Sequence, residues 1–125
     1  MLVDTDVLIW YMRGNNRAFK IIEELGSFSI SVVTYIELVQ GMRNKQELTE
    51  LRKAIRNWNC KIIHINEEIS SKAMFYVERH FLSNSLQLAD SLIATTAIVN
   101  SLTILTGNDK HFKIITDVNI KKFRP

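Results

Sequence analysis

The chain has 125 residues, of which 46% are hydrophobic and 23% charged, so it is long enough for one domain with a substantial core and short for two. Its net charge of +3 permits an anionic partner without requiring one. The single cysteine, Cys60, excludes an internal disulfide and a thiolate zinc cluster.

The sequence predicts a single domain over residues 1–125 that acts in the cytoplasm and has no contact with a membrane. The first residues lead directly into a strand pattern, not into a charged and apolar signal segment. The apolar stretches fall well short of the ~20 residues that a membrane-spanning helix needs. Only one proline and four glycines are present, so we expect no flexible linker.

Short apolar runs alternate along the chain with longer amphipathic stretches. In chain order the pattern predicts a strand at 2–3, a helix through 7–11, a helix at 16–25, a strand at 28–32, a helix from about 36 to 41, a helix at 46–57, a strand at 60–65, helices at 67–82 and 86–100, a strand at 103–105, and a helical turn near His111 before a basic tail. Strand–helix alternation without a hairpin signal favours a parallel sheet covered by helices on both faces.

Four acidic residues follow or interrupt segments that the pattern predicts to be buried: Asp4, Glu37, Asp90 and Asp109. A carboxylate beside an apolar wall costs free energy unless it is paired, hydrogen-bonded or bound to a cation. Ligands of parallel sheets bind beyond the carboxyl ends of the strands, and all four residues can reach that rim. Oxygen ligands suit hard cations, so the pattern predicts a divalent metal site.

The first two acidic residues also have structural interpretations. Asp4 stands where a strand becomes a helix, so it could simply cap that helix. Thr5 and Asp6 follow at once, however, and supply more oxygen atoms than one cap needs, with Asp6 either a direct ligand or a supporting residue. Glu37 forms a possible capping box with Thr34. That pair could serve both purposes if its helix begins earlier, at Ser31.

The other two acidic residues differ in how strongly they point to a metal. With Ser83 or Asn84 as the helix cap, Asp90 would lie beyond the first helical turn, where the helix dipole helps a carboxylate little. Asp90 therefore needs another partner, and a metal ion is a good one.

The last acidic residue lies in a segment rich in turn-forming residues, Thr106-Gly107-Asn108-Asp109. Either Asn108 or Asp109 could face the site, and Thr106 could offer a hydroxyl. We favour Asp109 because it is charged. The cations of the basic tail, Lys121, Lys122 and Arg124, could contact RNA or simply be solvated.

Four motifs, taken together, resemble those of PIN-domain ribonucleases, and more narrowly of the VapC-type toxins of prokaryotic toxin–antitoxin modules. They are Asp4–Ile9, Ser31–Leu38 with Gly41, Ala89–Ala94 and Thr106–Phe112. Each motif alone is weak, but their order and spacing fit, and the resemblance runs from the first residue to the last predicted strand.

The resemblance implies an α/β/α sandwich around a parallel sheet of about five strands, and endonucleolytic cleavage of RNA that depends on Mg²⁺ or Mn²⁺. It implies that Asp4, Glu37 and Asp90 are catalytic metal ligands. The fourth acidic position of the family falls on Asn108 here, so Asp109 is the expected substitute, with Thr5, Asp6 and Thr106 in support. The implied partners are an RNA substrate, a cognate antitoxin and a second copy of the chain.

Other functions fit less well or stay open. A phosphatase of the haloacid dehalogenase type shares Asp4 and Asp6 but needs a later pair of adjacent aspartates, which this chain lacks. A response-regulator receiver needs an aspartate that closes its third strand, where this chain has Asn66. A PIN nuclease of RNA processing outside a toxin system, and a catalytically idle PIN-like module that binds RNA or protein, both remain as alternatives.

Overall fold

The computed structural model describes residues 1–83 and 86–125 of the chain. Its elements follow the predicted order, with these bounds: β1 Leu2–Val3, α1 Thr5–Met12, α2 Asn16–Leu25, β2 Phe28–Ser31, α3 Val32–Gln40, α4 Lys45–Asn57, β3 Cys60–Ile63, α5 Glu67–His80, α6 Leu88–Val99, β4 Ile104–Thr106, the 3₁₀ helix η1 Asp109–His111, and β5 Ile120–Lys122. Among these helices, none has the length and apolar character to cross a membrane.

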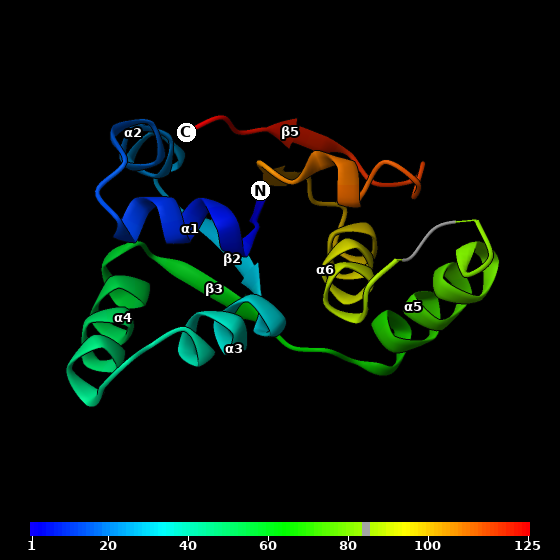
Figure 1. Ribbon diagram of the computed structural model, residues 1–125, viewed down its shortest axis with the longest axis horizontal. Helices are drawn as coiled ribbons and strands as arrows, with labels where there is room; N and C mark the ends of the chain where they lie inside the picture. Colours follow the sequence, from blue (N-terminus) through cyan, green and yellow to red (C-terminus); the bar gives the residue numbers. More distant parts are fainter. Residues whose placement is uncertain (84–85) are drawn as a thin grey trace.

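The five strands form one parallel sheet in the order β3-β2-β1-β4-β5. Figure 1 shows α1 to α4 gathered on one side of this sheet and α5 and α6 on the other. The predicted α/β/α sandwich around a five-stranded parallel sheet is confirmed. The strand order reverses between β1 and β4, which is where open parallel sheets bind their ligands.

The core lies on both faces of the sheet because successive strand residues point to opposite sides. In β1, Val3 packs into the cluster beneath α1 to α4, whereas Leu2 packs into the cluster beneath α5 and α6. Leu105 and Ile104 of β4 divide in the same way. All four side chains are completely buried. Two covered faces explain why the strands read as continuous apolar runs and not as alternating ones.

Side-chain caps explain where several helices begin. Asn15, Asn44 and Asn66 each accept a hydrogen bond from the backbone N–H three residues later, at 2.9 Å in every case, at the starts of α2, α4 and α5. Each bond satisfies a backbone donor that has no partner inside the helix. The predicted bounds of α2 agree with the structure, and α4 begins one residue earlier than predicted.

Several bounds differ from the predictions: α3 begins at Val32 and not near 36, β3 ends at Ile63 and not at 65, and α5 ends at His80 and not at 82. Two further differences concern the end of the chain and α6. The predicted basic tail contains the edge strand β5, which sequence analysis missed because an exposed edge strand with two lysines lacks an apolar pattern. The α6 helix begins at Leu88, after the extended residue Gln87, so Ser83 does not cap it. Asn84, the other predicted cap, lies outside the described residues.

Candidate active site

Asp4 lies at the switch point of the sheet, directly after β1, and is only 5% exposed. Its backbone N–H donates to the Leu105 carbonyl, which fixes it against β4. One carboxylate oxygen caps α1 by accepting from the Thr5 N–H at 2.8 Å, and the other accepts from the Thr106 hydroxyl, also at 2.8 Å. Burial raises the pKa of the Asp4 carboxyl to about 7, and the nearby Asp6 carboxylate adds to the rise.

Asp6 ties α1 to the loop that follows β4. Its Oδ2 accepts from the Gly107 N–H at 2.8 Å. Its Oδ1 is buried and has no hydrogen-bond partner among the described residues. Burial raises the pKa of this carboxyl as well. An unpaired buried oxygen beside Asp4 is costly, and a cation or a protonated partner would relieve that cost.

Glu37 reaches the same region from α3. The Thr5 hydroxyl donates to Glu37 Oε1 at 2.7 Å and lies 3.1 Å from the Thr34 hydroxyl. The helix is capped by Ser31, whose Oγ accepts from the Val33 N–H. The capping box of Thr34 and Glu37 is therefore wrong, and the alternative start at Ser31 is confirmed. The Glu37 carboxylate instead accepts from Thr5, the residue directly after Asp4.

Asp90 is the third residue of α6, and its partner is a histidine. The prediction that it lies beyond the first turn is wrong, because the helix begins four or more residues later than the predicted caps. The helix dipole therefore favours its carboxylate. Asp90 Oδ2 also lies 3.4 Å from His111 Nδ1. Burial raises the pKa of Asp90, with a further rise from Glu37 and an opposing effect of His111.

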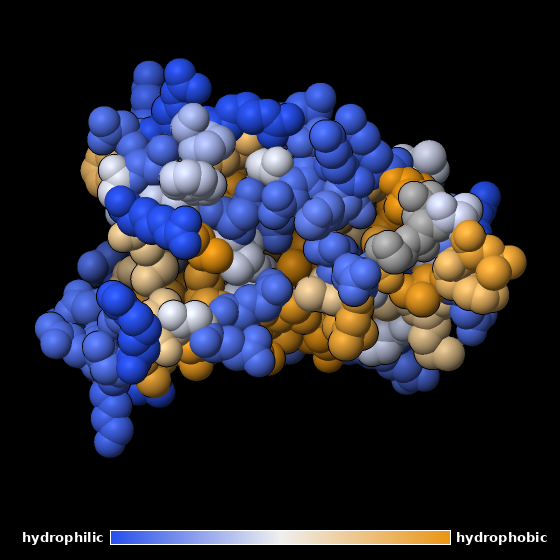
Figure 2. Space-filling view, viewed as in Figure 1, coloured by the Kyte–Doolittle hydropathy of each residue, from blue (hydrophilic) through white to orange (hydrophobic). Residues whose placement is uncertain are grey.

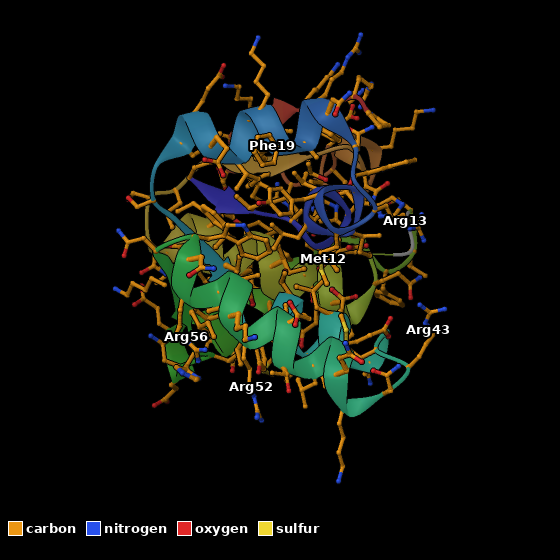
Figure 3. All side chains as sticks on the ribbon, turned by 90° about the vertical axis from the view of Figure 1, so that its left-hand side faces the viewer. Met12, Arg13, Phe19, Arg43, Arg52 and Arg56 are labelled. Atoms are coloured by element: carbon orange, nitrogen blue, oxygen red, sulfur yellow. The ribbon has the colours of Figure 1, made fainter. Side chains whose placement is uncertain are left out.

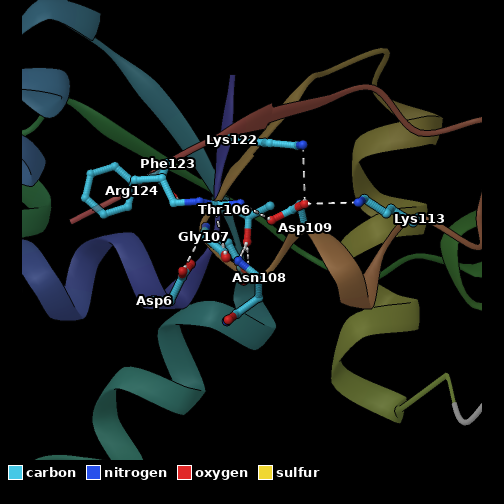
Figure 4. Close-up of polar contacts among 10 residues, drawn as sticks. Asp6, Thr106, Gly107, Asn108, Asp109, Lys113, Lys122, Phe123 and Arg124 are labelled. Carbon is cyan, nitrogen blue, oxygen red and sulfur yellow. Dashed lines mark hydrogen bonds and ion pairs between the residues drawn. The ribbon is translucent and has the colours of Figure 1, made fainter.

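Asn108 and Asp109 leave the loop after β4 in different directions (Figure 4). Asn108 is exposed, and its N–H donates to the Thr106 hydroxyl oxygen at 2.9 Å. Asp109 is 3% exposed and faces three cations: Arg124 at 3.0 Å, Lys113 at 3.6 Å and Lys122 at 3.8 Å. The hydrogen bond from Arg124 lowers the pKa of Asp109, whereas the pKa of Asp4 and that of Asp90 are raised.

The structure thus brings Asp4, Asp6, Asp90 and Glu37 together and gives Asp109 other partners. Repulsion from Asp6 and Asp90 raises the pKa of Asp4, and repulsion from Glu37 raises the pKa of Asp90. Sequence analysis favoured Asp109 over Asn108 on charge alone. It missed that three cations already neutralise Asp109, so this carboxylate has little need of a metal ion.

The donor set fits a hard divalent cation. Within residues 1–83 and 86–125, no three acidic, histidine or cysteine side chains are placed so that they could together hold a metal ion. Mg²⁺ does not require three, since it keeps several waters and usually takes one or two carboxylates together with substrate phosphates. The raised pKa of Asp4 and the buried, unpaired Asp6 oxygen mark carboxyls whose ionised form a bound cation would stabilise.

A cleft of about 820 Å³ begins at Glu37 and runs between α1, α3 and the start of α4. Ile9, Met12 and Met42 line it with apolar side chains. Its charged residues are two arginines and three glutamates: Arg13, Arg43, Glu37, Glu47 and Glu50. Figure 3 shows Met12 and Arg13 at the end of α1, across from Arg43, whereas Arg52 and Arg56 of α4 point away from the molecule.

Two residues near the site were not predicted. Sequence analysis gave His111 no role in the site, yet its Nδ1 lies 3.4 Å from Asp90 Oδ2. Arg124 was left open, and it donates to Asp109 and to the Gly107 carbonyl. No local signal marks either contact, because both depend on where β5 and η1 lie in the fold.

Comparison with known proteins identifies similar chains. The profile of the family described as PIN domain matches residues 1–117. Ribonuclease VapC1 of Methanocaldococcus jannaschii is 32% identical over 97% of this chain and 85% of its own length. Ribonuclease VapC10 of Mycobacterium tuberculosis is 36% identical over 90% of this chain and 85% of its own length.

Solved structures share the fold. VapBC2 from Rickettsia felis, bound to a DNA fragment from its promoter, superposes with a TM-score of 0.86 at 18% identity and covers 98% of both chains. A toxin–antitoxin complex from Klebsiella pneumoniae has a TM-score of 0.76 at 26% identity, over 94% of this chain and 93% of that one.

Gly107→Ala should destabilise the site, because the new Cβ would lie 2.6 Å from Asp6 Oδ2 and 3.2 Å from the Phe123 carbonyl oxygen. We expect a loss of about 1–3 kcal/mol in the free energy of unfolding, as for other overpacked positions. Urea unfolding measures it. The control is Gly41→Ala, whose Cβ would meet only ordinary contacts at 3.5 and 3.8 Å. Equal stability of the two variants would contradict the tight approach of Asp6 to this loop.

Stability without metal should fall as pH rises from about 4 to about 7. The unfolded Asp4 carboxyl loses its proton near pH 4, whereas the folded one holds it to about pH 7, so the folded state binds more protons in this window. Urea unfolding in the presence of chelator measures the free energy against pH. Asp4→Asn should show a smaller fall, and an equal fall in both proteins would contradict the raised pKa.

Proposed function

Because this chain belongs to the PIN-domain family, we propose that it is an Mg²⁺- or Mn²⁺-dependent endoribonuclease and the toxin of a type II toxin–antitoxin pair. The observation that carries the proposal is the convergence of Asp4, Glu37 and Asp90, from three separate elements, at the switch point of the sheet. Relatives named as VapC ribonucleases and structural neighbours that are VapBC complexes support it.

Asp4, Glu37 and Asp90 are the residues that would hold the metal, with Asn108 as a neutral neighbour on the same loop as Thr106. A bound divalent ion supplies an activated water and neutralises charge that develops on the phosphate oxygens. The pKa of Asp4, raised to about 7, means that this carboxyl is only partly ionised at neutral pH, and a bound cation would favour the ionised form.

The remaining side chains hold these carboxylates in place. The Thr106 hydroxyl and the Thr5 N–H each occupy one oxygen of Asp4 and so fix its orientation. The Thr5 hydroxyl does the same for Glu37. Fixed ligands matter because the partners that orient metal ligands typically contribute 10–100-fold in affinity or activity.

The cleft beside Glu37 suits a protein partner. Its walls carry Ile9, Met12 and Met42, and its polar residues include three glutamates against two arginines. An antitoxin segment with apolar side chains and a basic residue would complement these walls and end at Glu37. Copurification of the product of a small upstream gene tests the toxin role against a role in RNA processing outside a toxin system.

We also propose a homodimer. The second half of α5 and the residues after it expose large apolar side chains: Met74, Phe75, Phe81 and Leu82, which are 54–88% exposed. Figure 2 shows apolar surface over this end of the molecule. Large exposed apolar patches are rare on monomers and mark interaction sites. Light scattering of the purified chain tests this, and a monomer mass at micromolar concentration would contradict it.

We place the enzyme in the cytoplasm with its RNA substrate.

Asp90→Asn should reduce cleavage of total RNA by at least about 100-fold, because it removes a ligand charge and not merely an orienting partner. The fold should survive, since Asn keeps the shape of the side chain. Cleavage by the unchanged chain should disappear with chelator and return with Mg²⁺ or Mn²⁺. Full activity of the variant with metal would remove Asp90 from the site. A chain that never cleaves RNA with metal would instead support an idle PIN-like module.

Asp109→Asn should reduce cleavage less than Asp4→Asn. Asp109 already has three cationic partners, whereas the carboxylate of Asp4 accepts from two neutral groups, the Thr5 N–H and the Thr106 hydroxyl. Initial cleavage rates at saturating Mg²⁺ compare the two variants. Equal losses would mean that Asp109 also acts as a metal ligand.

A further inference from the structure

Three cations surround one buried carboxylate beside the candidate active site. We call Lys113, Lys122 and Arg124 the cationic cluster. Their nitrogens lie 3.0–3.8 Å from the oxygens of Asp109, whose side chain is 4% exposed. The three cationic side chains are themselves 56–59% exposed. One carboxylate therefore orders three positive charges that face solvent, and the group keeps a net charge of +2.

The two lysines have hydrogen-bonding capacity left for a ligand. Their nitrogens lie 3.6 and 3.8 Å from Asp109, beyond the 2.7–3.2 Å range of an N–H···O hydrogen bond. Each ammonium carries three donors. Arg124 differs, because it donates to Asp109 and also to the Gly107 and Phe123 carbonyls. Arg124 holds the loop after β4 in place through these hydrogen bonds. The two lysines add positive charge beyond what that structural role requires.

The cationic cluster lies beside Asp4 along the same edge of the sheet. The Phe123 N–H donates to the Thr106 carbonyl, and the Thr106 hydroxyl donates to Asp4. Lys122 is paired in register with Thr106. Neighbouring strands are about 4.8 Å apart, so the end of β5 is roughly two strand spacings from the end of β1. Figure 4 shows Lys113 on the side of Asp109 away from Asp6, and Lys122 above Asp109.

We propose that the cationic cluster is a phosphate-binding subsite that holds a backbone phosphate of the RNA next to the scissile one. This inference rests on the proposed ribonuclease function. The carboxylates of the active site repel a polyanion, so an RNA strand that crosses them needs positive charge nearby. The cationic cluster supplies that charge on the adjoining strand, and Asp109 keeps it in a fixed place before RNA arrives.

The test is the salt dependence of RNA binding by a Lys113→Ala/Lys122→Ala variant. Every protein carries Asp90→Asn so that the RNA is not consumed, and fluorescence anisotropy follows a labelled random pool of single-stranded RNA with Mg²⁺ present. Loss of two phosphate contacts should lower the magnitude of the slope of log affinity against log salt by about 1.4, at about 0.7 for each contact with a single strand. Affinity at low salt should fall as well.

The matched control is Lys20→Ala/Lys53→Ala in the same background, which removes the same charge from exposed positions on α2 and α4. Its slope should stay within a few tenths of the parent protein. Equal slopes for the two variants would overturn the proposal and leave the cationic cluster a structural fastening of β5, or a site for an acidic partner segment. In the chain with Asp90 intact, cleavage that depends on Mg²⁺ separates that result from failure of the ribonuclease assignment itself.

Thermal unfolding of both variants tests whether a change in the salt slope comes merely from loss of folded protein. A merely structural role of the lysines would lower the melting temperature of Lys113→Ala/Lys122→Ala and leave the salt slope unchanged. A phosphate-binding role changes the slope in protein that remains folded. Lys113→Arg/Lys122→Arg keeps both charges and should retain the parent slope, and a slope as low as that of the alanine variant would contradict the phosphate contacts.

Discussion

The hydrogen bond from the Thr106 hydroxyl to the Asp4 carboxylate is the interaction on which the site depends. It joins the ends of β1 and β4, at the point where the strand order reverses. The same hydroxyl accepts from the Asn108 N–H, so the loop after β4 and the start of α1 are held as one unit. Asp6 and Gly107 provide the second connection between the two segments. Burying a carboxylate here is expensive, and these bonds keep its orientation fixed.

Charge is separated along the carboxyl edge of the sheet. Carboxylates gather where β1 meets α3 and α6, and cations gather where β5 follows β4. Asp109 lies between the two groups, and its contacts are with the cations. Such an arrangement would suit the proposed reaction on a polyanion, because the cations would attract the strand while the carboxylates would hold the metal. His111 lies against Asp90 on the acidic side.

The two surfaces proposed for protein partners lie on opposite sides of the sheet. The cleft beside Glu37 lies among α1, α3 and α4 and shares Glu37 with the candidate active site. The apolar end of α5 lies in the other helical layer (Figure 1). A partner in the cleft would therefore block the site, whereas a second copy on α5 would leave it open. This separation is consistent with an enzyme that is silenced by one partner and assembled by another.

Local pattern alone was enough for a parallel sheet covered by helices and for the order of the elements. It also singled out Asp4, Glu37, Asp90 and Asp109 as candidate ligands, and this assignment stays a prediction. Hydrophobic period, caps and strand ends are read from a few neighbouring residues, and an acidic residue in an apolar run is visible without coordinates. Only the tertiary structure decided that Asp109 turns away to the cations of β5 while Asn108 stays exposed. The direction of a side chain after a strand depends on the turn and on partners far along the chain. Neither the β5 pairing nor the Asp90–His111 contact leaves a local trace in the sequence.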